Sequence, residues 1–95
     1  MIRIVQEALT NVRKHAQATR VRVTAREVDA ELLLEVADDG RGFDPANSVA
    51  AARFGLRGMR ERAESVGAEF QIMSHPHEGG TTVQLRVPLR MGVKL

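Results

Sequence analysis

The chain has 95 residues, a length that suits one small domain and leaves no room for a second. Hydrophobic residues make up 43% and charged residues 27%, which is typical of a globular protein rather than a disordered tail. The formal net charge is +2, cysteine is absent and 3% of the residues are aromatic. These values exclude a disulfide scaffold, a cysteine-based zinc finger and an aromatic platform for single-stranded nucleic acid.

A first helix is predicted over residues 2–16, because apolar side chains recur there at the spacing of one helix face. This apolar stripe consists of Ile2, Val5, Ala8, Leu9, Val12 and Ala16. The same geometry places Glu7, Asn11 and Lys14 together on what we expect to be the opposite, polar face. No signal-peptide pattern and no membrane-spanning apolar stretch occurs, so direct membrane contact is not expected.

Alternating apolar and polar residues predict a half-buried strand at 20–26 and a more buried strand at 32–37. Residues 29–31 are predicted to connect the two strands as a hairpin. Residues 38–54 are rich in Gly, Asp, Asn, Ser and Ala, and they are predicted to form a long loop, which in a compact domain is usually functional or mobile.

A second helix is predicted over residues 56–66, with Gly67 as its C-terminal stop. Its core-facing residues are expected to be Leu56, Met59, Ala63 and Val66. Two further strands are predicted at 68–74 and 81–89, joined by a turn at 76–80. His75 and His77 are interpreted as surface residues of that turn.

Strand pairs joined by short turns predict an α+β fold, a two-layer sandwich with helices on one face of a mostly antiparallel mixed sheet. Residues 90–95 are predicted to form a tail. The helix at residue 2 has no N-cap residue before it, so we expect the chain to be N-terminally truncated.

Residues 38–42, Asp-Asp-Gly-Arg-Gly, are the first stretch with chemical potential. Two glycines one residue apart let the main chain adopt positive φ and let a ligand approach it closely. A carboxylate at the end of a strand can accept a hydrogen bond from an exocyclic amine. An ordinary turn after a strand has the same composition.

Residues 55–58, Gly-Leu-Arg-Gly, open the second helix. A glycine-rich turn at a helix N-terminus presents main-chain N–H groups and the positive end of the helix dipole, which suit phosphate. A flexible helix start with a solvated basic face explains the same residues, and a G-x-x-G turn also occurs in the KH module that clamps RNA.

The polar stripe of the first helix is the third stretch. Asn11 supplies a neutral oxygen suited to Mg²⁺, Lys14 and His15 supply donors that can face phosphates, and Glu7 can orient a nucleophile. A solvated helix face has the same spacing.

In this order, the three stretches resemble the motifs of the Bergerat-fold ATPases, and most closely those of the ATP-binding catalytic domain of bacterial sensor histidine kinases. The residues that look like the N box, the G1 box, the G2 box and the terminal strand are 6–16, 38–44, 55–63 and 80–89. The wording of the N box and G2 box is closest to the subfamily that signals to helix-turn-helix response regulators.

At the adenine end, the resemblance implies that Asp38 binds the adenine amine and that Thr81 supports it through water. Gly40 and Gly42 then shape the adenine pocket, and residues 44–54 form a lid over ATP.

At the phosphate end, the resemblance implies that Asn11 holds Mg²⁺ and that Lys14 and His15 face the phosphates. Glu7 occupies the position of the family's polar or acidic catalytic residue. The start of the second helix meets the phosphates through Gly55, Leu56 and Gly58.

The resemblance implies that residues 1–95 form one ATP-binding domain of a cytoplasmic or membrane-anchored sensor kinase, with ATP and Mg²⁺ as cofactors. The expected partners are the kinase's own dimerisation and phosphoacceptor domain and, through it, a response regulator. The parent protein is expected to be a homodimer, its ATP-binding domain is expected in the cytoplasm, and no nucleic-acid partner is expected.

Two alternatives stay open on the sequence alone. One is an anti-sigma-factor serine kinase on the same fold, and the other is a nucleotide-binding or interaction domain without catalysis. Because no His has the family's phosphoacceptor context, the chain by itself is expected to bind ATP without completing autophosphorylation.

Overall fold

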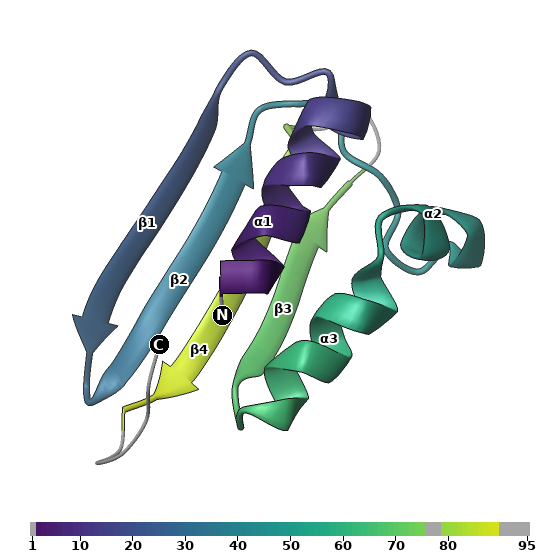
Figure 1. The fold of residues 1–95 in the computed structure, drawn as a ribbon. Helices are drawn as coiled ribbons and strands as arrows, with labels where there is room; N and C mark the ends of the chain where they lie inside the picture. The colour runs from purple at the N-terminus through teal and green to yellow at the C-terminus, as the bar shows by residue number, and fades with distance from the viewer. Residues whose placement is uncertain (1, 76–78, 90–95) are drawn as a thin grey trace.

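The chain folds into a four-stranded sheet with its helices on one side (Figure 1). The computed structural model describes residues 2–75 and 79–89, apart from the side chains of residues 2, 15 and 16. The elements in chain order are α1 (Ile2–Asn11), a π-helical turn η1 (Val12–Ala16), β1 (Val21–Val28), β2 (Glu31–Asp38), α2 (Ser48–Arg53), α3 (Leu56–Ser65), β3 (Glu69–Ser74) and β4 (Thr81–Pro88).

The strand order in the sheet is β1-β2-β4-β3, and each of the three pairings is antiparallel. The predicted two-layer α+β sandwich is therefore confirmed. The sheet formed by the described strands is wholly antiparallel, where the sequence analysis expected a mixed sheet. Antiparallel pairing follows from two hairpins, β1 with β2 and β3 with β4, which join along β2 and β4.

The hairpin between β1 and β2 turns on Asp29 and Ala30, as predicted. Their φ angles are +52° and +61°, so both residues are left-handed. Two left-handed central residues are typical of the type I′ turn, whose twist matches that of the flanking strands. This turn lies at the opposite end of β2 from Asp38.

The core lies between the sheet and the helices α1 and α3 (Figure 1). Its most deeply buried large side chains are Ile4, Met59, Leu85 and Val87, which come from α1, α3 and β4. The buried residues of α3 are Leu56, Met59 and Ala63, at helical spacing. These contacts hold both helices against the centre of the sheet.

Three burial predictions were wrong. Ile4 is only 1% exposed although the predicted stripe left it out, whereas Val66 is 51% exposed because α3 has already ended at Ser65. The strand β1 is exposed rather than half-buried, with Val21 and Val23 at 44% and 49%. The helices cover the middle and the β3 side of the sheet, and they leave the inner face of β1 open (Figure 1).

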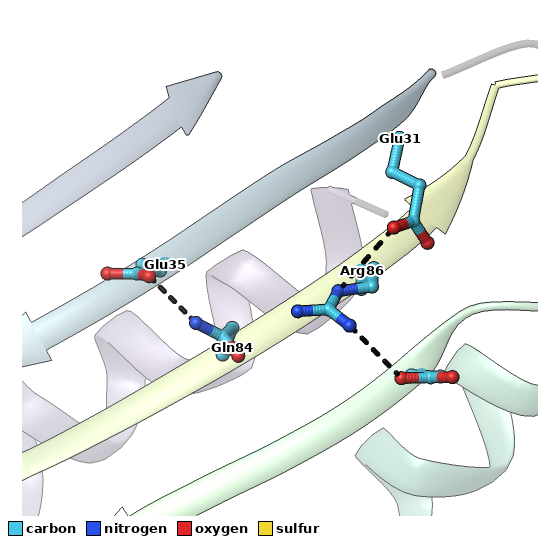
Figure 2. Close-up of polar contacts among 5 residues, drawn as sticks. Glu31, Glu35, Gln84 and Arg86 are labelled. Atoms are coloured by element: carbon cyan, nitrogen blue, oxygen red, sulfur yellow. Dashed lines mark hydrogen bonds and ion pairs between the residues drawn. The ribbon is translucent and has the colours of Figure 1, made fainter. Parts of the chain in front are cut away.

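The face of the sheet away from the helices is polar. Arg86 lies between two carboxylates, 3.8 Å from Glu31 and 4.0 Å from Glu69, and Gln84 donates to Glu35 at 2.8 Å (Figure 2). Cross-strand pairs of opposite charge stabilise a sheet modestly. The outer face thus needs no helix over it, and the helices gather on the other face.

The segment predicted as one long loop contains a short helix, α2. Asn47 caps it, because its side-chain oxygen accepts a hydrogen bond from the Ala50 N–H at 3.0 Å. None of the residues of α2 is buried. The stop predicted at Gly67 is confirmed by its left-handed φ of +72°.

The predicted turn at 76–80 falls partly, and the predicted tail at 90–95 wholly, outside the described residues. In the part of the chain that the structure does describe, no helix combines the length and the apolar character needed to cross a membrane.

Candidate functional site

A row of three polar side chains crosses one end of the sheet on its helix-covered face. Ser74 of β3 pairs with Thr81 of β4. Because Ala37 pairs with Thr82, one further step of the same register places Asp38 of β2 opposite Thr81. Directly opposed side chains of antiparallel strands lie on the same face within reach of each other. The sheet register therefore brings Asp38 and Thr81 together, as the sequence analysis required for a base-binding site.

Two glycines allow the main chain to close tightly around this row. A Cβ at Gly80, whose φ is +86°, would overlap the carbonyl oxygen of Asp38. A Cβ at Gly42, whose φ is +68°, would overlap the carbonyl oxygen of His75. Glycine is the residue that tolerates both the positive φ and the close approach.

The main chain also positions the Asp38 carboxylate. The Gly40 N–H donates to Asp38 Oδ1 at 2.8 Å. A carboxylate offers about four lone-pair sites, so this bond leaves capacity for donors from a ligand. Gly40 thus acts through its amide.

Ser74 is a residue that the sequence analysis missed. It is 5% exposed, and its hydroxyl accepts from the Phe43 N–H at 2.8 Å and lies 2.7 Å from the Thr81 hydroxyl. The signal was a polar residue at a core-facing position, because Phe70, Ile72 and Ser74 alternate along the inner face of β3.

A cavity opens between α1 and this row. Its space is about 30 Å³, enough for two or three ordered water molecules and far too small for a purine ring. The residues that line it are Ala8, Asn11, Val12, Val36, Asp38, Gly42, Phe43, Phe54, Ile72, Thr81 and Val83.

Asn11 lies on this cavity together with Ala8 and Val12, rather than on a polar face opposite the core. The prediction of an opposite face was wrong, because residues three apart on a helix are neighbours on one face. The Asn11 side-chain N–H group donates to the Phe54 carbonyl at 2.7 Å. Since a carbonyl only accepts, this bond assigns the nitrogen to Phe54 and leaves Asn11 Oδ1 for another partner.

Two phenylalanines that line the cavity pack against each other. The rings of Phe43 and Phe54 lie 4.1 Å apart, centroid to centroid, with an interplanar angle of 35°. Phe54 directly follows α2, so the same residue joins the end of the predicted lid to Asn11 and to the loop after β2.

The other predicted phosphate-facing residues lie near the end of α1. Lys14 is exposed on the π-helical turn η1, a kind of turn that is frequent at functional sites. The side chain of His15 lies outside the described part of the structure. Glu7 packs against Gly55, where a Cβ would lie 3.0 Å from a Glu7 carboxylate oxygen.

The start of α3 holds Gly55, Leu56 and Gly58 in different settings. Gly55 is left-handed at φ +66°, and the Leu56 side chain is 6% exposed in the core, so only the main chain of Leu56 can meet a ligand. A Cβ at Gly58 would meet only the far end of Arg62, at 3.9 Å. The fold therefore does not itself require glycine at position 58.

Asp39 ties the loop after β2 to the segment before β1. Its carboxylate accepts from the Thr19 hydroxyl at 2.6 Å, the Thr19 N–H at 2.8 Å and the Arg20 N–H at 2.9 Å. The hydroxyl of Thr19 and the amide of Arg20 hold the pKa of Asp39 below the ordinary value of an aspartate.

The described residues include no group of three His, Asp or Glu side chains arranged to hold a metal ion. Asn11 Oδ1 is a hard neutral oxygen, which fits a Mg²⁺ ion held mainly by phosphates and water. His75 is exposed, as predicted, and His77 lies outside the described residues.

Comparison with known proteins agrees with this geometry. Residues 1–91 match the family described as "Histidine kinase-, DNA gyrase B-, and HSP90-like ATPase". The chain is 39% identical over 89 residues to the sensor protein VraS of Staphylococcus aureus and 38% identical to that of Staphylococcus saprophyticus. Each match covers 94% of this chain and 25% of the relative, so the chain spans about a quarter of the length of these sensor proteins.

Solved structures are similar as well. The blue-light activated histidine kinase of Erythrobacter litoralis EL346 matches at 29% identity and a TM-score of 0.73, covering 90% of this chain and 28% of the kinase. The histidine kinase AdeS of Acinetobacter baumannii, at 11% identity, shares the fold with a TM-score of 0.75 over 92% of this chain and 44% of its own. By sequence and by fold, the chain belongs to the family of histidine kinase-, DNA gyrase B- and HSP90-like ATPases.

Proposed function

We propose that this chain binds Mg-ATP in the cavity between α1 and the sheet and supplies the γ-phosphate to a histidine on another domain of a sensor kinase. The observation that carries the proposal is the row of Asp38 and Thr81 on the floor of a cavity whose wall includes Asn11. This arrangement offers an acceptor for an exocyclic amine at one end and a magnesium ligand at the other.

At the base end, the carboxylate of Asp38 accepts a hydrogen bond from the adenine amine, and Thr81 adds a hydroxyl beside it. Gly42 keeps the main chain close to the base, and Gly40 holds the carboxylate in position through its N–H. A charge-assisted hydrogen bond in a closed pocket is among the stronger polar contacts available to a protein.

At the phosphate end, Mg²⁺ would neutralise charge on the phosphates, with Asn11 Oδ1 as the ligand from this chain. Lys14 and His15 add positive or donor groups from the end of α1. Glu7, which lies beside Gly55, would orient the attacking group. Phosphoryl transfer needs positioning and charge neutralisation more than covalent help from the protein.

The start of α3 and the lid complete the proposed site. The main-chain N–H groups from Gly55 to Gly58 suit phosphate oxygens, and the missing Cβ of Gly58 leaves room for them. Residues 44–54 act as the lid, because their helix buries no side chain and Asn11 of α1 holds the end of the segment at the Phe54 carbonyl.

The proposed partners follow from the relatives, which are sensor proteins about four times as long as this chain. The phosphoryl group passes to a histidine on the dimerisation domain of a homodimeric kinase, and from there to a response regulator. The ATP-binding domain works in the cytoplasm. The sensor relatives favour this reading over an anti-sigma-factor serine kinase.

Calorimetric titration with Mg-ATP tests the proposal, using the chain and its Asp38→Asn variant. Loss of one hydrogen bond to a charged group costs about 1.5–3 kcal/mol, so affinity is expected to fall roughly ten- to a hundredfold. Asp29→Asn, at the far hairpin, removes the same charge and tolerates the left-handed turn, so it serves as the control. Equal ATP affinity in the folded Asp38→Asn variant would contradict the assignment.

A further inference from the structure

Ser74 is the one buried polar residue in the described part of the chain, and the roles proposed above do not use it. Its hydroxyl accepts from the Phe43 N–H at 2.8 Å. It also lies 2.7 Å from the Thr81 hydroxyl and 3.4 Å from the Gly80 carbonyl oxygen. A buried hydroxyl with this many neighbours is placed by the fold, since burial without partners is costly.

The number of hydrogens limits how these contacts can be made. A serine hydroxyl has one hydrogen to donate and two lone pairs to accept with. The Phe43 N–H takes one lone pair, so the single hydrogen of Ser74 goes either to Thr81 or to the Gly80 carbonyl. Hydroxyl-to-oxygen hydrogen bonds span about 2.5–3.0 Å. The contact with Thr81 lies inside this range and allows either hydroxyl as the donor, whereas donation to Gly80 lies outside it, so Thr81 is the better placed acceptor for the Ser74 hydrogen.

This direction decides what Thr81 offers to the cavity. With Ser74 as the donor, Thr81 keeps its own hydrogen for a ligand, and Thr81 lines the cavity beside Asp38. The pair then presents an acceptor, the Asp38 carboxylate, next to a donor, the Thr81 hydroxyl. The adenine edge carries an amine donor beside a ring-nitrogen acceptor, whereas guanine and hypoxanthine carry an oxygen acceptor beside an N–H donor.

We propose that Ser74 is a positioning residue for base selection, which donates to Thr81 and so makes the Thr81 hydroxyl a donor matched to adenine. The inference rests on the proposed function, because it assigns the base specificity of the same site. Ser74 does not line the cavity, so it acts through Thr81 rather than by touching the base.

The test compares dissociation constants for ATP and inosine triphosphate in the full 95-residue chain. Inosine triphosphate carries the reversed donor and acceptor pair without the extra amine of guanine. Its base is therefore nearly the same size as adenine, and a difference in affinity reports the hydrogen bonds. In Ser74→Ala and in Thr81→Val, the preference for ATP is expected to fall roughly three- to tenfold, the effect of one neutral hydrogen bond. The double variant is expected to lose no more than either single variant, because one interaction is removed in all three.

Two control variants lie outside the site. Ser65→Ala removes a hydroxyl that donates to the Arg62 carbonyl at 2.7 Å at the end of α3. Thr82→Val changes the neighbour of Thr81, whose side chain lies on the opposite face of the sheet. Both are expected to keep the ATP preference of the unmodified chain.

Ser74→Ala also leaves the Phe43 N–H without its acceptor, so the free energy of unfolding is measured for every variant. If Ser74→Ala does not fold, Ser74→Cys replaces it, because a thiol is a weak donor and a weak acceptor of similar shape. An unchanged ATP preference in a folded Ser74 variant overturns the inference, as do additive effects of Ser74→Ala and Thr81→Val. If the unmodified chain binds neither nucleotide, the proposed function fails and this inference with it.

Discussion

The two ends of the site are built in different ways. At the base end, Asp38, Thr81 and Ser74 stand on three neighbouring strands, and the main chain closes around them at Gly42 and Gly80. At the phosphate end, the wall consists of a helix end and a short helix without a buried residue, which meet at the carbonyl and the ring of Phe54.

We expect base recognition and ligand entry to depend on different parts of the molecule. Regions with dense packing open only with the whole fold, whereas segments with few buried contacts open locally at little cost. The sheet therefore holds the base-selecting groups in one arrangement. We expect the site to open for a ligand at the short helix α2, because none of its residues is buried.

The largest expected effect comes from breaking the close packing at the base end. Gly80→Ala places a Cβ against the Asp38 carbonyl, so the free energy of unfolding in urea is expected to fall by about 3 kcal/mol or more. Gly79 has nearly the same φ, +84° against +86°, but nothing lies within 4 Å of its Cβ position. Gly79→Ala is therefore expected to cost only about 1–2 kcal/mol. Equal losses in the two variants would show that the close approach contributes nothing.

A smaller effect is expected at the loosely held end, from Asn11→Asp. A carboxylate cannot donate to the Phe54 carbonyl and repels it, so amide hydrogen exchange across residues 44–54 should accelerate in the free chain. The magnesium-dependent gain in ATP affinity should fall roughly tenfold, although a carboxylate is ordinarily a better Mg²⁺ ligand than an amide.

Asn47→Asp is the matched control for this prediction, because Asn47 uses its oxygen as an acceptor and aspartate caps a helix equally well. Its lid should exchange at the rate of the unmodified chain. Mg-ATP should slow exchange over 44–54 in both the unmodified chain and the Asn47→Asp variant. Identical exchange in the two Asp variants would mean that the bond from Asn11 to Phe54 does not hold the lid.

The smallest effect is expected at Gly58, where stability and binding should change in opposite directions. Alanine stabilises a helix interior by roughly 0.5–1 kcal/mol over glycine, and the chain itself leaves room for the Cβ. The same Cβ would intrude on a phosphate at the start of α3, so ATP affinity should fall. Gly67→Ala, in a left-handed position beyond α3, should lower stability and leave affinity unchanged. Unchanged affinity in Gly58→Ala would remove Gly58 from the proposed site.

Much of the fold could be predicted from the sequence because its elements are long and regularly patterned. The alternation in β2 and β4 and the spacing of Leu56, Met59 and Ala63 follow from burial of one face. The helix α2 has only six residues and no buried side chain, so no apolar period marks it. Burial of Ile4 and exposure of β1 depend on where the helices lie over the sheet, which is a property of the packed layers.

The candidate site was less predictable than the fold. Motif order indicated Asp38, Thr81 and Asn11, but the contact of Asn11 with the Phe54 carbonyl depends on how the chain returns after α2. Ser74 belongs to no sequence motif, and only the strand register shows that it lies beside Thr81. Residues that act on other residues, rather than on a ligand, leave the weakest trace in a single sequence.

The carboxylate of Asp39 connects the loop that follows Asp38 with the segment between η1 and β1. Asp39 follows Asp38 directly in the chain. Its carboxylate accepts hydrogen bonds from Thr19 and Arg20, which lie just beyond the turn η1 that carries Lys14.

The stability that these hydrogen bonds contribute depends on pH. Because the hydrogen bonds lower the pKa of Asp39 in the folded chain, they contribute stability above the pKa of the unfolded chain and lose it as the pH falls through the lowered value. Acid therefore weakens the hydrogen bonds between the loop after β2 and the segment before β1, whereas neutral pH preserves them.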